Sequence, residues 1–318
     1  MDTLFDLEAP GSFDRGRLRD SLTSLARENV FIGGSSWKYD GWLGQIYQRS
    51  NYMTRGKFSK SQFEQNCLRE YAGVFFTVCG DFAFYQFPTG DFWRRLFAQT
   101  PEGFQFSFKV PEQITCKVFP SHPRYGAQAG TENAAFLDAG MLRDMFLRAL
   151  EPYRSKTGVL IFEFGAFPKG TFPGAAGFAE RLDPFLSALP VGFRYGVEIR
   201  NREFLEPEYF ACLRRNGVAH VYSAWTRMPE LSDQLAIPES RTAAFSVCRA
   251  LLRHGRSYEH AVRDFAPYRE IRDANPEVRS SLRGMIEGAR AERRAAYIYV
   301  NNRLEGNAPI TIDAVVNG

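Results

Sequence analysis

Eight short runs rich in β-branched and aromatic residues recur along this chain of 318 residues, and longer amphipathic stretches separate them. This alternation predicts βαβ units and a parallel sheet. The predicted strands are Val30–Ser35, Phe75–Cys79, Phe104–Lys109, Val159–Phe164, Tyr195–Arg200, Ala219–Ala224, Ala243–Arg249 and Ala296–Asn301. Eight strands with intervening helices predict an α/β fold, a single (β/α)₈ TIM-type barrel.

Apolar residues at helical spacing predict the connecting helices. These stretches are Ser61–Tyr71, Met141–Tyr153, Phe178–Leu189, Pro207–Arg215 and Pro276–Arg294. Residues 1–28 precede the first strand, and Asp14–Arg27 predicts an added helix there. No Pro/Gly/Ser-rich linker follows, so we expect an N-terminal helical extension (1–28) and one barrel domain (29–318). The polar segment Ile114–Asn133 predicts a long loop after the third strand.

Several function classes lack their sequence signals. No stretch approaches the roughly 18 apolar residues of a membrane span, and Met1–Pro10 lacks the basic start of a secretory signal. The five cysteines are scattered, with no C-x-x-C pair, which favours a reducing cytoplasm over disulfides or a structural zinc. No phosphate-loop, serine-hydrolase, zinc-protease or dinucleotide motif is present. We therefore expect a cytoplasmic protein with no cofactor, no metal and no membrane partner, and the oligomeric state stays open.

Positive charge is concentrated in the last quarter of the chain. Between Arg241 and Arg303 there are 13 Arg, no Lys and 7 acidic residues, an excess of six charges, whereas the whole chain has an excess of four. An anionic ligand is therefore expected to meet this part of the chain.

Polar residues recur where the predicted strands end, and in TIM-type barrels these ends surround the ligand site. The ligand-binding candidates are Ser36, Trp37, Tyr39, Asp81, Tyr85, Arg200, Trp225, Arg249, Asn301, Asn302 and Arg303. The catalytic candidates are Glu198, Glu163 and Lys109. Such groups are costly to bury unless they are paired. A ring of them predicts a polar site, and the alternative that Glu198 simply pairs with Arg200 or Arg249 stays open.

The segment Tyr299–Pro309 is the most distinctive. We call the opening of the barrel at the carboxyl ends of its strands the mouth. Adjacent residues of a strand point to opposite sides, so Asn301 and Asn302 can both line the mouth only if the strand has ended before them. Gly306 allows close approach of a ligand, or it only shapes the turn into the last helix. Cys79, Cys116 and Cys248 could converge near the mouth, and their role stays open.

Five segments in order carry a family resemblance: Gly34–Trp42, Phe84–Pro88, Phe106–Pro111 with Ile114-Thr115, Tyr195–Arg200, and Asn301-Asn302 with Gly306 and Ala308. On these segments the chain resembles the YecE-like family, also called domain of unknown function 72. The resemblance implies a TIM-type barrel and no established reaction.

The chain departs from the pattern of that family at several positions. Cys79 and Asp81 stand where the family has Glu and Asn, Cys116 where a His is common, and Asn201 and Phe204 where His and Trp are usual. Glu163 replaces a Gln. The chain therefore resembles a divergent branch, and an activity that needs those His residues does not carry over.

Two functional hypotheses follow. The first is an enzyme, an acid/base lyase, isomerase or hydrolase, acting on a small polar or anionic ligand such as a phosphorylated or carboxylated sugar. Glu198 and Glu163 would move protons, and Lys109, Arg200 and Arg249 would neutralise the ligand. Phosphate or sulfate is expected near Arg249 and Arg303, in loops that also contain Arg253 and Arg256.

The second hypothesis is a nucleic-acid-binding or repair-related barrel. The Arg-rich last quarter would contact phosphates, and Trp37, Trp42 and Trp225 would stack on bases. A non-catalytic ligand-binding protein is a further alternative. The sequence leaves the substrate and the reaction type open.

Overall fold

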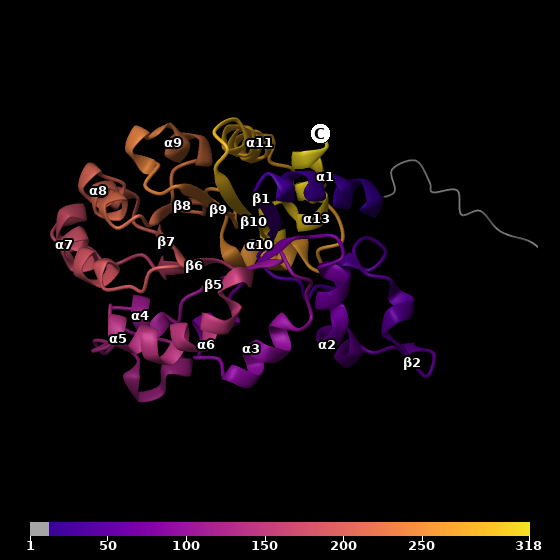
Figure 1. The fold of residues 1–318 in the computed structure, drawn as a ribbon, viewed down its shortest axis with the longest axis horizontal. Helices are drawn as coiled ribbons and strands as arrows, with labels where there is room; N and C mark the ends of the chain where they lie inside the picture. Colours follow the sequence, from indigo (N-terminus) through magenta and orange to yellow (C-terminus); the bar gives the residue numbers. More distant parts are fainter. Residues whose placement is uncertain (1–12) are drawn as a thin grey trace, which may run out of the picture.

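Eight parallel strands close into a barrel in the computed structural model, which describes residues 13–318 (Figure 1). The strands are β1 (Val30–Gly34), β4 (Thr77–Gly80), β5 (Gln105–Lys109), β6 (Thr157–Phe164), β7 (Arg194–Ile199), β8 (Ala219–Ala224), β9 (Phe245–Ala250) and β10 (Ala295–Val300). Each strand lies beside the next in the chain, and β10 pairs with β1 to close the sheet. The predicted (β/α)₈ barrel is confirmed, with strand bounds within two residues of those expected. A separate hairpin, β2 (Met53–Thr54) and β3 (Lys57–Phe58), precedes α2.

Helices surround the barrel (Figure 1). They are α1 (Arg15–Arg27), α2 (Lys60–Tyr71), α3 (Gly90–Phe97), α4 (Glu112–Thr115), α5 (Ala139–Leu142), α6 (Arg148–Leu150), α7 (Gly174–Ser187), α8 (Pro207–Arg215), α9 (Leu231–Ala236), α10 (Tyr258–Phe265), α11 (Pro276–Ala291), α12 (Asn302–Glu305) and α13 (Ala308–Val316). Within residues 13–318, no helix combines the length and the apolar character needed to cross a membrane.

The predicted helix Met141–Tyr153 is present but irregular. It runs through α5, a π-helical turn over Arg143–Leu147, α6 and a 3₁₀ segment over Glu151–Lys156, with helical backbone at each junction. Pro152 has no amide hydrogen to continue an α-helical pattern, which accounts for the change to 3₁₀ geometry. The predicted long loop is largely confirmed, since only α4 and a 3₁₀ segment at Pro123–Gln128 interrupt it.

The predicted N-terminal helix is confirmed as α1, and it packs against β1 and α13. The Asp14 carboxylate accepts a hydrogen bond from the Arg17 amide at 2.8 Å, which caps the first turn. Its buried leucines, at positions 18, 22 and 25, recur at helical spacing. Ser21 Oγ donates to Asn317 Oδ1 at 2.6 Å, so the first and last helices of the described chain lie side by side.

The interior of the barrel changes character from one end to the other. An apolar cluster fills its lower part, formed by Phe31, Cys79, Val159, Ile161, Ala219, Val221, Val247, Tyr297 and Tyr299. Tyr299 also donates a hydrogen bond to Ser107 Oγ at 2.5 Å. Alternate residues of a strand share a face. On β6, Val159 and Ile161 face inward and Glu163 is the next inward-facing residue; on β9, Val247 faces inward and Arg249 is the next. The uppermost layer of the interior is therefore charged.

Candidate functional site

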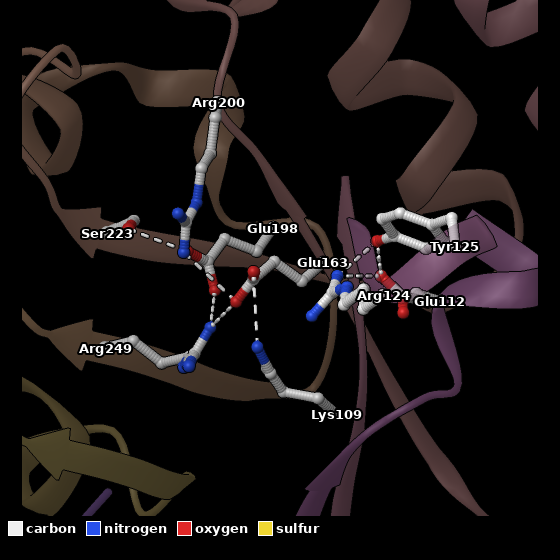
Figure 2. Close-up of polar contacts among 9 residues, drawn as sticks. All are labelled: Lys109, Glu112, Arg124, Tyr125, Glu163, Glu198, Arg200, Ser223 and Arg249. Carbon is white, nitrogen blue, oxygen red and sulfur yellow. Dashed lines mark hydrogen bonds and ion pairs between the residues drawn. The ribbon is translucent and has the colours of Figure 1, made fainter. Parts of the chain in front are cut away.

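A buried ion cluster occupies the carboxyl ends of the strands (Figure 2). Lys109 ends β5, Glu163 and Glu198 lie near the ends of β6 and β7, and Arg249 lies near the end of β9. Glu163 and Glu198 are directly opposite each other in the parallel pairing of β6 with β7. Arg200 directly follows β7 and joins them, so the cluster brings together all three predicted catalytic residues and two predicted ligand-binding arginines.

Glu163 lies at the centre of the cluster. Its Oε2 atom accepts from Arg249 Nη1 at 2.5 Å and lies 3.1 Å from Arg200 Nη2. Its Oε1 atom accepts from Lys109 Nζ at 3.4 Å. One carboxylate therefore contacts three cations.

Glu198 is fully buried and engaged on both oxygens. Oε1 accepts from Ser223 Oγ at 3.0 Å and from Arg200 Nη2 at 3.2 Å, and Oε2 accepts from Arg249 Nη1. The pairing that the sequence left open as an alternative is present, because Glu198 contacts both arginines. Glu198 thus holds Arg200 and Arg249 in place and does not present itself to the mouth.

The cluster carries more positive than negative charge. Lys109, Arg200 and Arg249 face two carboxylates, so one cation is in excess. Arg200 is the most accessible member, with 15% of its side chain exposed, and its guanidinium lies 3.9 Å from the centre of the Trp225 ring. The Nε atoms of Arg200 and Arg249 are buried and have no hydrogen-bond partner among residues 13–318. An anion at the mouth would offset the excess charge.

The environment fixes the protonation states. Burial alone would raise the pKa of Glu163, but Arg200, Lys109 and Arg249 outweigh it and hold that pKa well below its usual range. Glu163 is therefore ionised at neutral pH and can accept a proton but not donate one. Burial raises the pKa of Cys79 to about 12, so this thiol stays protonated and is a poor nucleophile. Cys248 is likewise buried with a raised pKa.

The lowered pKa of Glu163 predicts how stability depends on pH. A carboxylate with a depressed pKa stabilises the fold fully above its ordinary value of 4.5, and this contribution is lost as the pH falls below that value. We expect wild type to be more stable than Glu163→Gln near neutral pH and the difference to narrow below about pH 4.5. Urea unfolding of both proteins at a series of pH values measures this. A constant difference throughout the acidic range would contradict the assignment.

A second polar cluster lies beside the ion cluster and joins Glu112 to Arg124 and Tyr125 of the long loop after β5 (Figure 2). Glu112 of α4 accepts from Arg124 Nη2 at 2.7 Å and from Tyr125 Oη at 2.6 Å. The Arg124 guanidinium also lies 4.9 Å from the centre of the exposed Tyr85 ring. The sequence analysis missed Glu112 and Arg124. The position of Glu112 just beyond the end of a strand was the available signal.

Asn301 and Asn302 have structural partners. The strand ends at Val300, and Asn301 caps α12 by accepting from the Arg303 amide at 2.9 Å. Asn301 Nδ2 also donates to Ser35 Oγ at 2.6 Å. Asn302 is buried, and its Oδ1 accepts from Trp42 Nε1 at 3.2 Å and from the Ala308 amide at 2.7 Å. Asn302 therefore fixes the turn between β10 and α13. We expected it to line the mouth, but its side chain is buried against Trp42 and Ala308.

Gly306 serves the same turn. Its φ of +118° is a conformation that favours glycine, and a Cβ atom there would lie 2.5 Å from the Glu270 carbonyl oxygen. The close approach is to the chain itself, which favours the turn over the ligand as the reason for this glycine.

The remaining candidates on the first two strands lie outside the ion cluster. Trp37 is buried with its ring edge against Phe82, and Tyr39 packs against Trp42 and Tyr268. Ser36 and Asp81 line a groove beside the barrel. Trp42 is buried and lies in the core, so it is not available for stacking on a base.

The Arg-rich last quarter is largely neutralised. Nine of its arginines form ion pairs, and their acidic partners include Glu28 and Glu305 from outside this segment. Arg253 and Arg256 both pair with Asp273, and Arg249 is closed into the ion cluster. These three are therefore not the free anion-binding groups that the sequence led us to expect. Arg303 forms no ion pair within residues 13–318, and its guanidinium lies 4.5 Å from the centre of the Tyr258 ring.

No group of three or more His, Cys, Asp or Glu side chains in residues 13–318 is arranged to hold a metal ion. The acidic residues of the mouth have arginine and lysine as their neighbours.

Comparison with known proteins extends over most of the chain. The family model described as "Protein of unknown function DUF72" matches residues 31–317. A DUF72 family protein from Thermotoga maritima is similar in structure, with 18% identity and a TM-score of 0.57 over 90% of this chain and 96% of that chain. A DUF72 family protein from Enterococcus faecalis has 16% identity and a TM-score of 0.57 over 91% and 96% of the two chains. No curated protein matches. At these identities the structural likeness shows a shared fold.

Proposed function

Because this chain belongs to the DUF72 family of proteins of unknown function, we propose a function from its own site: an enzyme that binds a small organic anion at the mouth of the barrel and removes a proton from it. The excess of one buried cation at the carboxyl ends of the strands carries this proposal. A buried charge without a partner is costly, and a bound carboxylate or phosphate would supply the partner.

Lys109 and Arg200 are the groups that would contact the anion. Glu163 is the one side-chain acceptor within hydrogen-bonding distance of the Lys109 ammonium in the described chain, which leaves further N–H donors for a ligand. Lys109 Nζ also lies 3.7 Å from the centre of the Phe84 ring, which closes one side of the ammonium. Arg200 offers a planar guanidinium suited to carboxylate or phosphate.

Glu163 would act as the base. It is ionised and lies beside the anion-binding groups, and a bound anion would offset the cations that lower its pKa and so make it a stronger base. Its cationic neighbours would stabilise negative charge that develops on the ligand. Glu198 and Arg249 are positioning residues, since they contact Glu163 or Arg200 and are closed off from the mouth. Proton abstraction next to an anionic group is a step that lyases and isomerases of sugar phosphates or hydroxy acids share.

The enzyme would work in the reducing cytoplasm, which the five free thiols support. The nucleic-acid hypothesis has less support, because Trp42 is buried and most arginines of the last quarter are paired.

Replacement of Lys109 by Met tests the anion site. We expect Lys109→Met to weaken binding of a small anion by about 1.5–3 kcal/mol, the contribution of a charged hydrogen bond. Isothermal titration with inorganic phosphate, and then with a panel of sugar phosphates and hydroxy acids, measures the effect. Lys117→Met is the matched control, because Lys117 pairs with the exposed Glu132 in the long loop.

Two results separate binding from chemistry. Glu163→Gln leaves one more cation without a counter-ion, so it should bind the anion at least as tightly as wild type and lose turnover of any substrate that the panel reveals. Equal affinity of wild type and Lys109→Met would place the anion elsewhere, and full activity of Glu163→Gln would remove Glu163 as the base.

A further inference from the structure

A groove of about 870 Å³ lies between α2 and α3, two helices that are neighbours in Figure 1. It begins at Ser36 and Asp81, just beyond β1 and β4, and extends outward from the barrel. Its apolar lining consists of Trp37, Leu68, Phe82, Phe92, Leu96 and Ala98. Phe82 and Phe92 are only partly buried, so aromatic surface is open to a ligand. The volume falls in the range of small-molecule sites.

The rim of this groove carries cations without acidic partners. Lys38, Arg69 and Arg95 line it, and none of them forms an ion pair or a side-chain hydrogen bond within residues 13–318. Other charged residues of α2 and α3 do form ion pairs: Arg94 pairs with Asp91 at 2.9 Å, and Lys60 Nζ lies 4.0 Å from Glu64. The lining contains two carboxylates, Glu64 beside Lys60 and Asp81 at the inner end, and Asp81 forms no ion pair within residues 13–318. The rim therefore has an excess of positive charge over an apolar floor.

The groove is separate from the ion cluster of the mouth. The 3₁₀ turn Phe82–Phe84 lies between them, with Phe82 lining the groove and the Phe84 ring against Lys109 Nζ. Phe82 also packs against Trp37 and Phe108, which fixes this turn as a wall. A ligand in the groove would therefore leave the mouth open.

We propose that the groove between α2 and α3 is a second binding site, which takes a small amphipathic anion. The apolar part of the ligand, an aromatic ring system or a short acyl chain, would lie on Phe82, Phe92 and Leu96. Its carboxylate, sulfonate or phosphate would contact Arg69 and Arg95, with Lys38 nearby. Aromatic surface with unpaired cations above it recognises such a ligand through burial and charge together. This site does not depend on the function proposed for the mouth.

Fluorescence titration with 8-anilinonaphthalene-1-sulfonate tests the site, and neutral N-phenyl-1-naphthylamine is the matched probe without the charge. We expect the sulfonate to bind wild type and the double variant Arg69→Gln/Arg95→Gln to bind it about tenfold more weakly, a loss of about 1.4 kcal/mol. Ala98→Trp, at an exposed position of the lining, should abolish binding of both probes by filling the groove. Binding of the neutral probe should be unaffected by the arginine changes.

Arg94→Gln is the control for the arginines, because Arg94 is adjacent in sequence, paired with Asp91 and outside the lining. Circular dichroism confirms that each variant is folded. The proposal is overturned if wild type binds neither probe, if Arg94→Gln weakens the sulfonate as much as the double variant does, or if Ala98→Trp binds as wild type. Lys109→Met should bind the sulfonate normally, which separates this site from the mouth.

Discussion

Replacing Glu198 by Ala is expected to lower the free energy of unfolding by about 3–5 kcal/mol, the usual cost of removing one partner from a buried ion pair. Glu198 is fully buried and contacts the side chains of Arg200, Arg249 and Ser223. Without it, three cations would share the single carboxylate of Glu163 in the interior of the barrel. Urea unfolding followed by circular dichroism measures the loss.

Two variants identify charge as the cause. Glu292→Ala removes an exposed carboxylate that pairs with Arg241 and Arg294, and it should cost less than about 1 kcal/mol. The double variant Glu198→Leu/Arg249→Met restores the wild-type excess of one cation, so we expect it to be more stable than Glu198→Ala. If Glu198→Ala costs no more than Glu292→Ala, the cluster is not the buried network described.

Glu305→Ala is expected to lower the free energy of unfolding by a similar amount, about 3–5 kcal/mol. Glu305 lies in α12, just after β10, and is not part of the ion cluster. Glu305 is fully buried, and its oxygens accept from Arg279 Nη2 at 2.8 Å, from the Asn275 amide at 2.5 Å and from Thr311 Oγ1 at 2.7 Å. This one carboxylate ties the start of α11 to α13. Its loss should lower the melting temperature markedly in differential scanning calorimetry.

Glu277→Ala is the control for Glu305, because Glu277 lies in the first turn of the same helix α11 and is exposed. Its effect should stay within about 0.5 kcal/mol, as for most surface substitutions. Equal melting temperatures of the two variants would mean that the contacts of Glu305 contribute little to stability.

The strands were predictable because each is a short apolar run bounded by polar residues, and Ala219–Ala224 matches its predicted bounds. The helices were less so. The sequence analysis did not identify α3, α9 or α10, which have only eight, six and eight residues. Helices this short show too few turns for an apolar periodicity to stand out, and packing against the barrel stabilises them instead.

The members of the ion cluster could be predicted, but not their partners. Position at the end of a strand identified Lys109, Glu163, Glu198 and Arg249. Which carboxylate meets which cation depends on register between strands, such as Glu163 opposite Glu198, and local propensity does not encode register. The same limit applies to Arg290, whose partner Glu28 lies at the other end of the chain.

The pairing of β1 with β10, which closes the barrel, has a consequence for folding during translation. The first strand of the barrel has its second neighbour only when the last strand pairs with it, from Val30 beside Ala296 to Gly34 beside Val300. A chain that emerges from the ribosome amino end first must therefore hold an open-edged sheet from the synthesis of β1 until the synthesis of β10. Unpaired strand edges are templates for aggregation. The nascent chain is thus most exposed to aggregation just before β10 (Ala295–Val300) emerges, when seven strands of the barrel exist and the sheet is still open.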